Sequence, residues 1–179
     1  MLKKIQTMSR HLDNTTSKIF NSRKELLHRV ENWRFKDRTV VFTNGCFDIL
    51  HKGHISLLCE AADLGDRLVV AVNSDRSVKE LKGEGRPMNT QDDRALILAA
   101  VQHVSAVIVF DEDTPADLIS FLRPDVLVKG GDYSEAVTDP SDPRFVVGSD
   151  TVRTYGGVVH TIPLVEGFST TGLLEKIRS

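Results

Sequence analysis

Cysteines are few and long apolar runs are missing in this sequence of 179 residues. Its two cysteines, Cys46 and Cys59, predict a reducing compartment, so we expect a cytoplasmic protein, and their spacing predicts no metal site. The longest apolar stretches have the length of strands, and the N-terminus lacks the apolar core of a signal peptide. We therefore expect no membrane partner.

A strong net charge is also missing. Lys+Arg 23 against Asp+Glu 25 gives a formal net charge of -2, whereas nucleic-acid-binding proteins usually carry a basic surface. We therefore expect no nucleic-acid partner. Hydrophobic residues make up 40% and charged residues 27% of the chain, which is typical of a globular domain.

The apolar pattern predicts strands that alternate with helices. Residues 1–21 read as a polar N-terminal extension and residues 22–179 as a single domain that begins with an amphipathic helix. The alternation predicts an α/β fold with a doubly wound parallel sheet of about five strands. The expected strands are residues 39–43, 67–73, 106–110, 125–129 and 158–163. The expected helices are residues 22–35, 55–62, 90–101, 148–155 and 170–177, with two more starting after a cap at Ser74 or Asp75 and at Pro115.

The segment from Thr39 to His54 combines the features of a phosphate site. A β-branched strand ends at Asn44, and a short loop then leads to His51 and His54 on either side of Gly53, where a helix pattern begins. Imidazole donors, a glycine that permits close approach and a positive helix N-terminus suit a reacting phosphate. A lone histidine in a loop is more often structural, and this is how we read the others: His11, His28, His103 and His160.

The run Asn44–His54 resembles the signature of the HxGH nucleotidyltransferase superfamily, which joins nucleoside monophosphates to phosphorylated acceptors. The resemblance implies a Rossmann-like fold and in-line attack of the acceptor phosphate on the nucleotide α-phosphate, without a covalent enzyme intermediate. His51 and His54 are then expected to stabilise the charge that builds up on the transferred phosphoryl group.

Three further segments match the family in the right order. Lys82–Pro87, followed by Arg94, is similar to the loop that serves the acceptor and the triphosphate, and Lys129–Asp132 is similar to the nucleotide-binding turn. Gly167–Thr171 precedes a predicted helix, whose N-terminus can meet the β- and γ-phosphates. Each segment taken alone also fits an ordinary turn or helix cap.

The resemblance implies three sets of site residues. The catalytic set is His51, His54, Lys82 and Arg94. The nucleotide-binding set is Asn44, Gly45, Cys46, Phe47, Gly53, His54, Lys129, Gly130, Gly131, Asp132, Ser169, Thr170 and Thr171. The substrate-binding set is Asp48, Asn73, Asp75, Lys82 and Arg86. A loop-capping role stays open for Asp48, and Asp75 and Asp132 are equally ambiguous.

From Ser22 to Ile177 the chain is most similar to the adenylyltransferase domain of bacterial heptose-1-phosphate kinase/adenylyltransferases. The residues that carry this likeness are Phe42–His51, Gly65–Asp75, Leu81–Pro87, Asp113–Pro115, Leu127–Tyr133 and Ser169–Thr171. The likeness implies transfer of AMP from ATP, with Mg²⁺, to D-glycero-D-manno-heptose 1-phosphate, which gives ADP-heptose for the lipopolysaccharide core. It also implies a homodimer and a separate heptose kinase upstream in the pathway.

Two alternatives stay open. Glycerol-3-phosphate cytidylyltransferases carry Arg-Thr-Glu-Gly before their Ser-Thr-Thr stretch, whereas this chain has Leu164–Gly167, which favours ATP and the heptose branch. Residues 134–147 form an insertion beside the nucleotide-binding turn, so the identity of the sugar stays open. The other alternative, a nucleotide-binding module without turnover, is disfavoured because the catalytic set is intact.

Overall fold

The computed structural model describes residues 9–163, 165, 167, 170 and 172. The helices are α1 (Arg10–Thr16), α2 (Arg23–Arg34), α3 (Lys52–Ala62), α4 (Asp75–Lys82), α5 (Gln91–Ala100), α6 (Ala116–Leu122) and α7 (Ser149–Thr154). The strands are β1 (Ile19–Phe20), β2 (Val40–Gly45), β3 (Arg67–Asn73), β4 (Val104–Phe110), β5 (Val126–Gly130) and β6 (Val158–Ile162).

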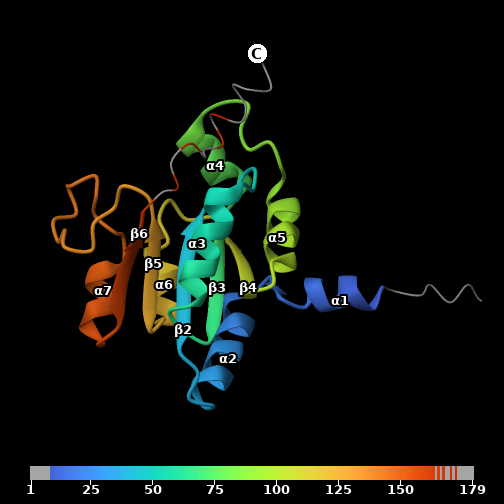
Figure 1. The fold of residues 1–179 in the computed structure, drawn as a ribbon, viewed down its shortest axis with the longest axis horizontal. Coiled ribbons are helices and arrows are strands. Elements are labelled where there is room, and N and C mark those ends of the chain that lie inside the picture. Colours follow the sequence, from blue (N-terminus) through green and yellow to red (C-terminus); the bar gives the residue numbers. More distant parts are fainter. Residues whose placement is uncertain (1–8, 164, 166, 168–169, 171, 173–179) are drawn as a thin grey trace, which may run out of the picture.

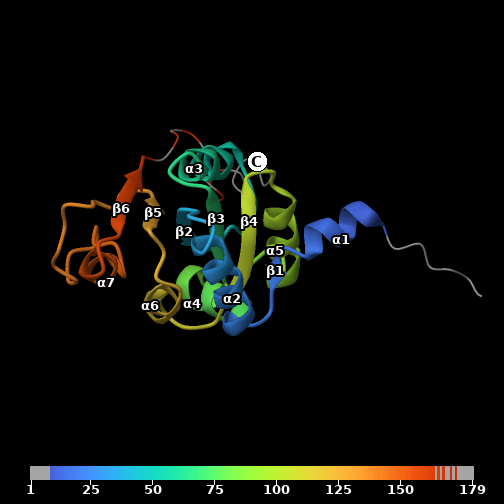
Figure 2. The ribbon, with the colours of Figure 1, turned by 90° about the horizontal axis from the view of Figure 1, so that it is seen from below.

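The strands of the described chain form one parallel sheet in the order β1-β4-β3-β2-β5-β6 (Figure 1). The central strands are apolar on both sides, and β3 is buried from Leu68 to Asn73. Strands of this composition need helices on both faces of the sheet. Figure 2 shows this arrangement, with α3 and α5 on one face and α2, α6 and α7 on the other. The prediction of a Rossmann-like, doubly wound fold is confirmed.

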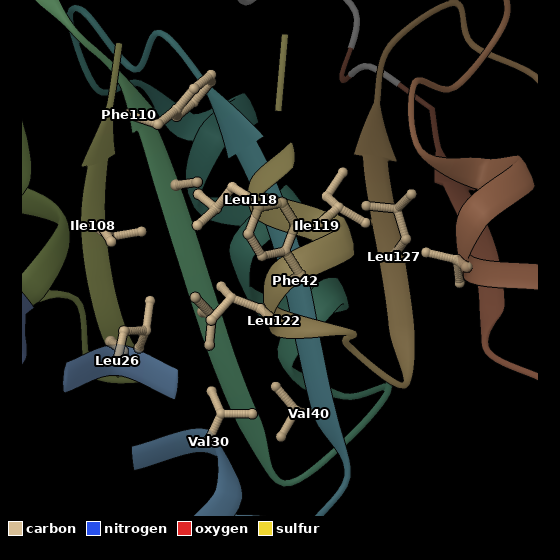
Figure 3. Packing of buried hydrophobic residues seen from close by; sticks show 14 of the residues in the cluster. Leu26, Val30, Val40, Phe42, Ile108, Phe110, Leu118, Ile119, Leu122 and Leu127 are labelled. Atoms are coloured by element: carbon tan, nitrogen blue, oxygen red, sulfur yellow. The ribbon is translucent and has the colours of Figure 1, made fainter. Parts of the chain in front are cut away.

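Two hydrophobic cores lie on the two faces. Alternate side chains of β2 enter opposite cores, because successive residues of a strand point to opposite faces. Phe42 packs with Leu118 of α6 in the first core (Figure 3), whereas Val41 packs with Leu58 of α3 in the second. All four side chains are at most 1% exposed, so the sheet is held firmly from both sides.

The strands and helix caps that the pattern predicts are largely confirmed. The five expected strands are present with ends shifted by at most two residues. Ser74 and Thr90 cap α4 and α5, since their hydroxyl oxygens accept from the backbone N–H of Ser77 at 3.1 Å and of Asp93 at 3.3 Å. The helix expected over residues 170–177 lies almost entirely outside the described residues.

A sixth strand, β1, falls within the segment that we expected to be a polar extension. Ile19 and Phe20 pair with Val107 and Ile108 of β4 at the edge of the sheet. Two residues are too short to show an alternating pattern, so the sequence carries no signal for this strand. The preceding α1 has no buried residue and extends away from the sheet (Figure 1). Among the described helices, none is both long and apolar enough to cross a membrane.

Candidate active site

The carboxyl ends of β2 and β5 meet where the strand order reverses. After β2 the chain builds the sheet toward β3 and β4, and it then returns to place β5 on the other side of β2. Lys129 bridges the two strand ends, because its ammonium lies 3.2 Å from Asn44 Oδ1 and 3.5 Å from the Asn44 carbonyl. A cavity of about 610 Å³ opens at this point. This is where doubly wound sheets bind nucleotides.

Most predicted site residues lie around this cavity. Those that line it are Asn44, Gly45, Cys46, Phe47, Asp48, His51, Gly53, His54, Asn73, Lys82, Arg86, Lys129, Gly130 and Thr170. Arg94, Asp75, Gly131 and Asp132 are outside the lining, and Ser169 and Thr171 are outside the described residues.

The two histidines of the signature are stacked at the start of α3. His51 occupies the N-cap position, and its carbonyl accepts from the backbone N–H of His54 at 3.0 Å. The ring centroids are 3.8 Å apart, with an angle of 23° between the planes. Phe47 is 4% exposed, and its ring centroid lies 5.2 Å from that of His54. The pair is therefore held by the helix and by an aromatic side chain before any ligand arrives.

Burial keeps both imidazoles neutral at pH 7. It lowers the pKa of His54 to about 4, with a further contribution from His51, while a contact with the Ile49 backbone acts in the opposite direction. Burial also lowers the pKa of His51. Both Nδ1 atoms are buried without a hydrogen-bond partner among the described residues. A phosphate that develops negative charge would accept hydrogen bonds from the N–H groups of these rings, which is the electrostatic assistance that phosphoryl transfer requires.

Lys129 supplies a positive charge on the β5 side of the cavity. Burial lowers the pKa of its ammonium to about 8, opposed by the nearby Cys46 thiol. The ammonium thus stays mostly protonated at pH 7, and it lies 5.2 Å from the centroid of the Tyr133 ring. Burial raises the pKa of Cys46, so its thiol is not activated as a nucleophile.

Arg94 holds the framework of the site and does not face the cavity. Its side chain is 0% exposed, and the guanidinium donates to the carbonyls of Asn89 at 3.1 Å and Cys46 at 2.6 Å. It also pairs with Asp75 at 2.7 Å. In this structure Arg94 and Asp75 contact each other and lie outside the cavity lining, and their predicted contact with phosphate or substrate stays a prediction. They tie the signature loop, the segment before α5 and the start of α4 together.

The turn after β5 contributes less to the cavity than expected. Lys129 and Gly130 line it, whereas Gly131 continues the strand pairing by donating from its N–H to the Ile162 carbonyl at 3.1 Å. Asp132 is exposed outside the lining. A Cβ at Gly130 would lie 2.9 Å from both terminal methyl carbons of Leu57, so a side chain there would require Leu57 to shift.

Other residues line the cavity that are in none of the three predicted sets of site residues. They follow the carboxyl ends of β4 and β6 or sit on helices beside the cavity, and they are Leu57, Leu81, Asp113, Thr114, Pro115, Tyr133, Val147, Ile162 and Pro163. Asp113–Pro115 and Tyr133 belong to segments that carried the family resemblance. The rule that ligands bind at strand carboxyl ends could have found those after β4 and β6.

An anion can thus be held between neutral imidazoles and lysines, in the crevice that doubly wound sheets use for nucleotides. No group of three or more His, Cys, Asp or Glu in the described part of the chain is arranged to hold a metal ion by itself. The fold and this cavity define a nucleotide-binding protein of the nucleotidyltransferase type.

Comparison with known proteins gives the family. The chain belongs to the cytidylyltransferase-like family, whose profile matches residues 42–171. The prediction of an HxGH-type nucleotidyltransferase is thereby confirmed.

Curated relatives share about half of their residues with the chain over the matched part. The bifunctional protein HldE of Koribacter versatilis is 57% identical over 155 residues, which cover 87% of this chain and 30% of the relative. HldE of Syntrophotalea carbinolica is 49% identical over 172 residues, which cover 96% of this chain and 33% of the relative. The chain therefore spans about a third of the length of these relatives.

Solved structures share the fold. A lipopolysaccharide core biosynthesis protein from Thermoplasma volcanium matches with a TM-score of 0.55 and 25% identity, over 72% of this chain and 97% of that protein. A pantoate-beta-alanine ligase from Francisella tularensis, solved with an ATP analogue and beta-alanine, matches with a TM-score of 0.54 and 15% identity, over 81% of this chain and 66% of that protein. The second likeness supports the fold alone.

Proposed function

We propose that this protein transfers AMP from ATP to D-glycero-D-manno-heptose 1-phosphate and releases pyrophosphate, and that the ADP-heptose serves lipopolysaccharide core synthesis. The observation that carries the proposal is the stacked pair His51–His54 at the switch point, with Lys129 on one side and Lys82 and Arg86 on the other. A reaction between two phosphorylated substrates needs cationic groups on both sides of the reacting phosphorus. The HldE relatives and the lipopolysaccharide core biosynthesis protein support the choice of acceptor.

The proposed reaction uses this arrangement as follows. An oxygen of the acceptor phosphate attacks the α-phosphorus of ATP, the bond from that phosphorus to the bridging oxygen breaks, and pyrophosphate leaves with the electron pair. His51 and His54 donate to the non-bridging oxygens of the α-phosphate as negative charge builds up there. Lys129 neutralises charge on the nucleotide side, and Lys82 and Arg86 neutralise the acceptor phosphate. Thr170, with Ser169 and Thr171, is proposed to meet the triphosphate tail.

Magnesium fits this site as a companion of the nucleotide. Among the described residues, the cavity lining offers two carboxylates, Asp48 and Asp113, and Asp48 is already engaged with protein groups. Mg²⁺ commonly binds through substrate phosphates and water with only one or two carboxylates. We therefore propose that Mg²⁺ enters with ATP and adds positive charge beside the phosphates.

The decisive experiment measures pyrophosphate release with ATP or CTP crossed with heptose 1-phosphate or glycerol 3-phosphate. Turnover with ATP and heptose 1-phosphate alone is the expected result. Turnover with CTP and glycerol 3-phosphate would replace this proposal with the cytidylyltransferase alternative. Tight nucleotide binding without turnover of any pair would instead indicate a binding module.

The expected assembly and location belong to the same proposal. We propose that the protein acts as a homodimer in the cytoplasm and receives its sugar phosphate from a separate heptose kinase. Analytical ultracentrifugation tests the dimer, and a coupled assay with an added heptose kinase tests the supply of substrate.

A further inference from the structure

Asp48, in the signature segment Asn44–His54, holds the residues that directly follow the loop over residues 82–87. Its Oδ1 accepts from the backbone N–H groups of Met88 at 2.6 Å and Asn89 at 3.2 Å, and its carbonyl accepts from Asn89 Nδ2 at 2.7 Å. Asp48 is 3% exposed, so this carboxylate is not free to bind a substrate through Oδ1.

The second carboxylate oxygen of Asp48 faces Arg86. Asp48 Oδ2 lies 2.7 Å from Arg86 Nε, and the side chains are 2% and 16% exposed. Neither atom has a hydrogen-bond partner in the described structure, so their ion pair is what compensates their burial. Arg86 also lines the cavity, and no described residue accepts from its terminal nitrogens. The ion pair therefore holds the inner end of the guanidinium and leaves its outer end for the cavity.

The charges around Arg86 favour an anion as the ligand of that outer end. Lys82 at the end of α4 adds a second cation to the lining, and His51 and His54 add imidazoles from α3. Asp113, which follows β4, is the other carboxylate among the described lining residues, and its side chain is 86% exposed. A guanidinium presents paired N–H donors that match two phosphate oxygens, and it does so best when its orientation is fixed.

We propose that Asp48 is a positioning residue that orients Arg86 to bind the acceptor phosphate in a two-donor contact. This inference rests on the proposed function and deepens it. Asp48 itself touches neither substrate. Its effect on the reaction passes through Arg86, which contacts the sugar phosphate.

The test is a double-mutant cycle with Asp48→Asn and Arg86→Ala, followed by kinetics with each substrate. The amide oxygen of the Asp48→Asn variant can still accept from Met88 and Asn89, so these hydrogen bonds are retained while the ion pair is lost. We expect KM for heptose 1-phosphate to rise about 10-fold in Asp48→Asn and about 30-fold in Arg86→Ala, as for loss of charge-assisted hydrogen bonds, with KM for ATP nearly unchanged. The double variant should equal Arg86→Ala.

If Asp48→Asn raises KM for heptose 1-phosphate equally in the presence and absence of Arg86, the proposal is overturned. Asp48 would then act only by holding Met88 and Asn89. Arg86→Lys gives a second readout that leaves Asp48 intact. Arg86→Lys should lose nearly as much acceptor affinity as Arg86→Ala, because a lysine ammonium that is paired with Asp48 offers no second N–H donor in a fixed direction. Retention of most of the acceptor affinity by Arg86→Lys would contradict the two-donor contact. Asp66→Asn, which breaks the exposed pair of Asp66 with Arg38 outside the cavity lining, is the matched control and should change nothing.

Binding of inorganic phosphate, measured by calorimetry, separates this inference from the proposed function. Coupling between Asp48 and Arg86 in phosphate affinity supports the positioning role even if heptose 1-phosphate is not the acceptor. Phosphate affinity that is independent of Arg86 would overturn the positioning role even if the enzyme turns over the proposed substrates.

Discussion

The two sides of the cavity are built differently. The β5–β6 side has one largely buried cation, Lys129, among apolar lining residues such as Leu57, Tyr133 and Ile162. The β3–β4 side carries several charged groups, including Lys82, and borders a segment with two glycines in left-handed conformations. A desolvated, rigid wall suits a base and ribose, whereas a charged and more open wall suits a phosphorylated polyol. This difference favours our proposal that the nucleotide binds on the first side and the acceptor on the second.

The histidine pair lies between the two sides, and replacing one of its histidines should have the largest effect on turnover. His54→Ala should lower kcat about 100- to 1000-fold, by analogy with loss of a single donor to a developing oxyanion. ATP affinity and the melting temperature should change little. His160→Ala, which changes a histidine outside the cavity lining, is the control for the assay of pyrophosphate release. An unchanged kcat in His54→Ala would remove this histidine from the mechanism.

Replacing each lysine in turn tests whether the two sides of the cavity bind different substrates. Lys129→Met should raise KM for ATP by about 10- to 100-fold, because the buried ammonium is lost on the nucleotide side alone. Lys82→Met should act mainly on KM for the acceptor. Steady-state kinetics with each substrate varied in turn distinguish the two. If both variants affect the same substrate, the assignment of the two sides fails.

The histidine pair should also make stability depend on pH. The pKa of His54 is about 4 in the folded protein and near 6.5 in the unfolded chain, so the unfolded chain binds more protons between these values. The contribution of His54 to the free energy of unfolding is therefore fully present above pH 6.5 and is lost as the pH falls toward 4. We expect a loss of about 2 kcal/mol, less than the full shift implies because the ring is partly exposed.

Urea unfolding at several pH values measures this loss, with His54→Gln as the comparison. The variant should lose less stability than the wild type between pH 6.5 and 4. An identical pH dependence in both proteins would show that His54 is not buried in its neutral form.

Two glycines give the smallest expected difference between the sides. Gly130→Ala would bring a Cβ within 2.9 Å of Leu57 and should raise KM for ATP by narrowing the nucleotide side. Gly83 has φ +89 with open space around it, so Gly83→Ala should cost about 1 kcal/mol of backbone strain without a clash. Thermal unfolding and substrate kinetics on both variants check this contrast. An effect of Gly83→Ala on ATP affinity equal to that of Gly130→Ala would erase it.

Much of the fold and part of the site follow from local patterns. Strand β3 has the predicted limits because its apolar run is bounded by polar residues, and His51 and His54 are found by their spacing. Strand β1 is not found, because two residues carry no period. The family resemblance implies a catalytic role for Arg94, which follows the charged segment Lys82–Pro87 in the sequence. Its burial depends on carbonyl and carboxylate partners that are distant in sequence.

The sequence by itself determined the alternating pattern, the strand ends that carry the site and the paired histidines, because each of these is written in adjacent residues. Only the tertiary structure decided which charged side chains face the cavity. Asp48 and Asp75 are both carboxylates near loops in the sequence, yet Asp48 orients an arginine of the lining and Asp75 pairs with a buried arginine behind it. The physical reason is that burial and pairing depend on neighbours that the sheet brings together from distant parts of the chain.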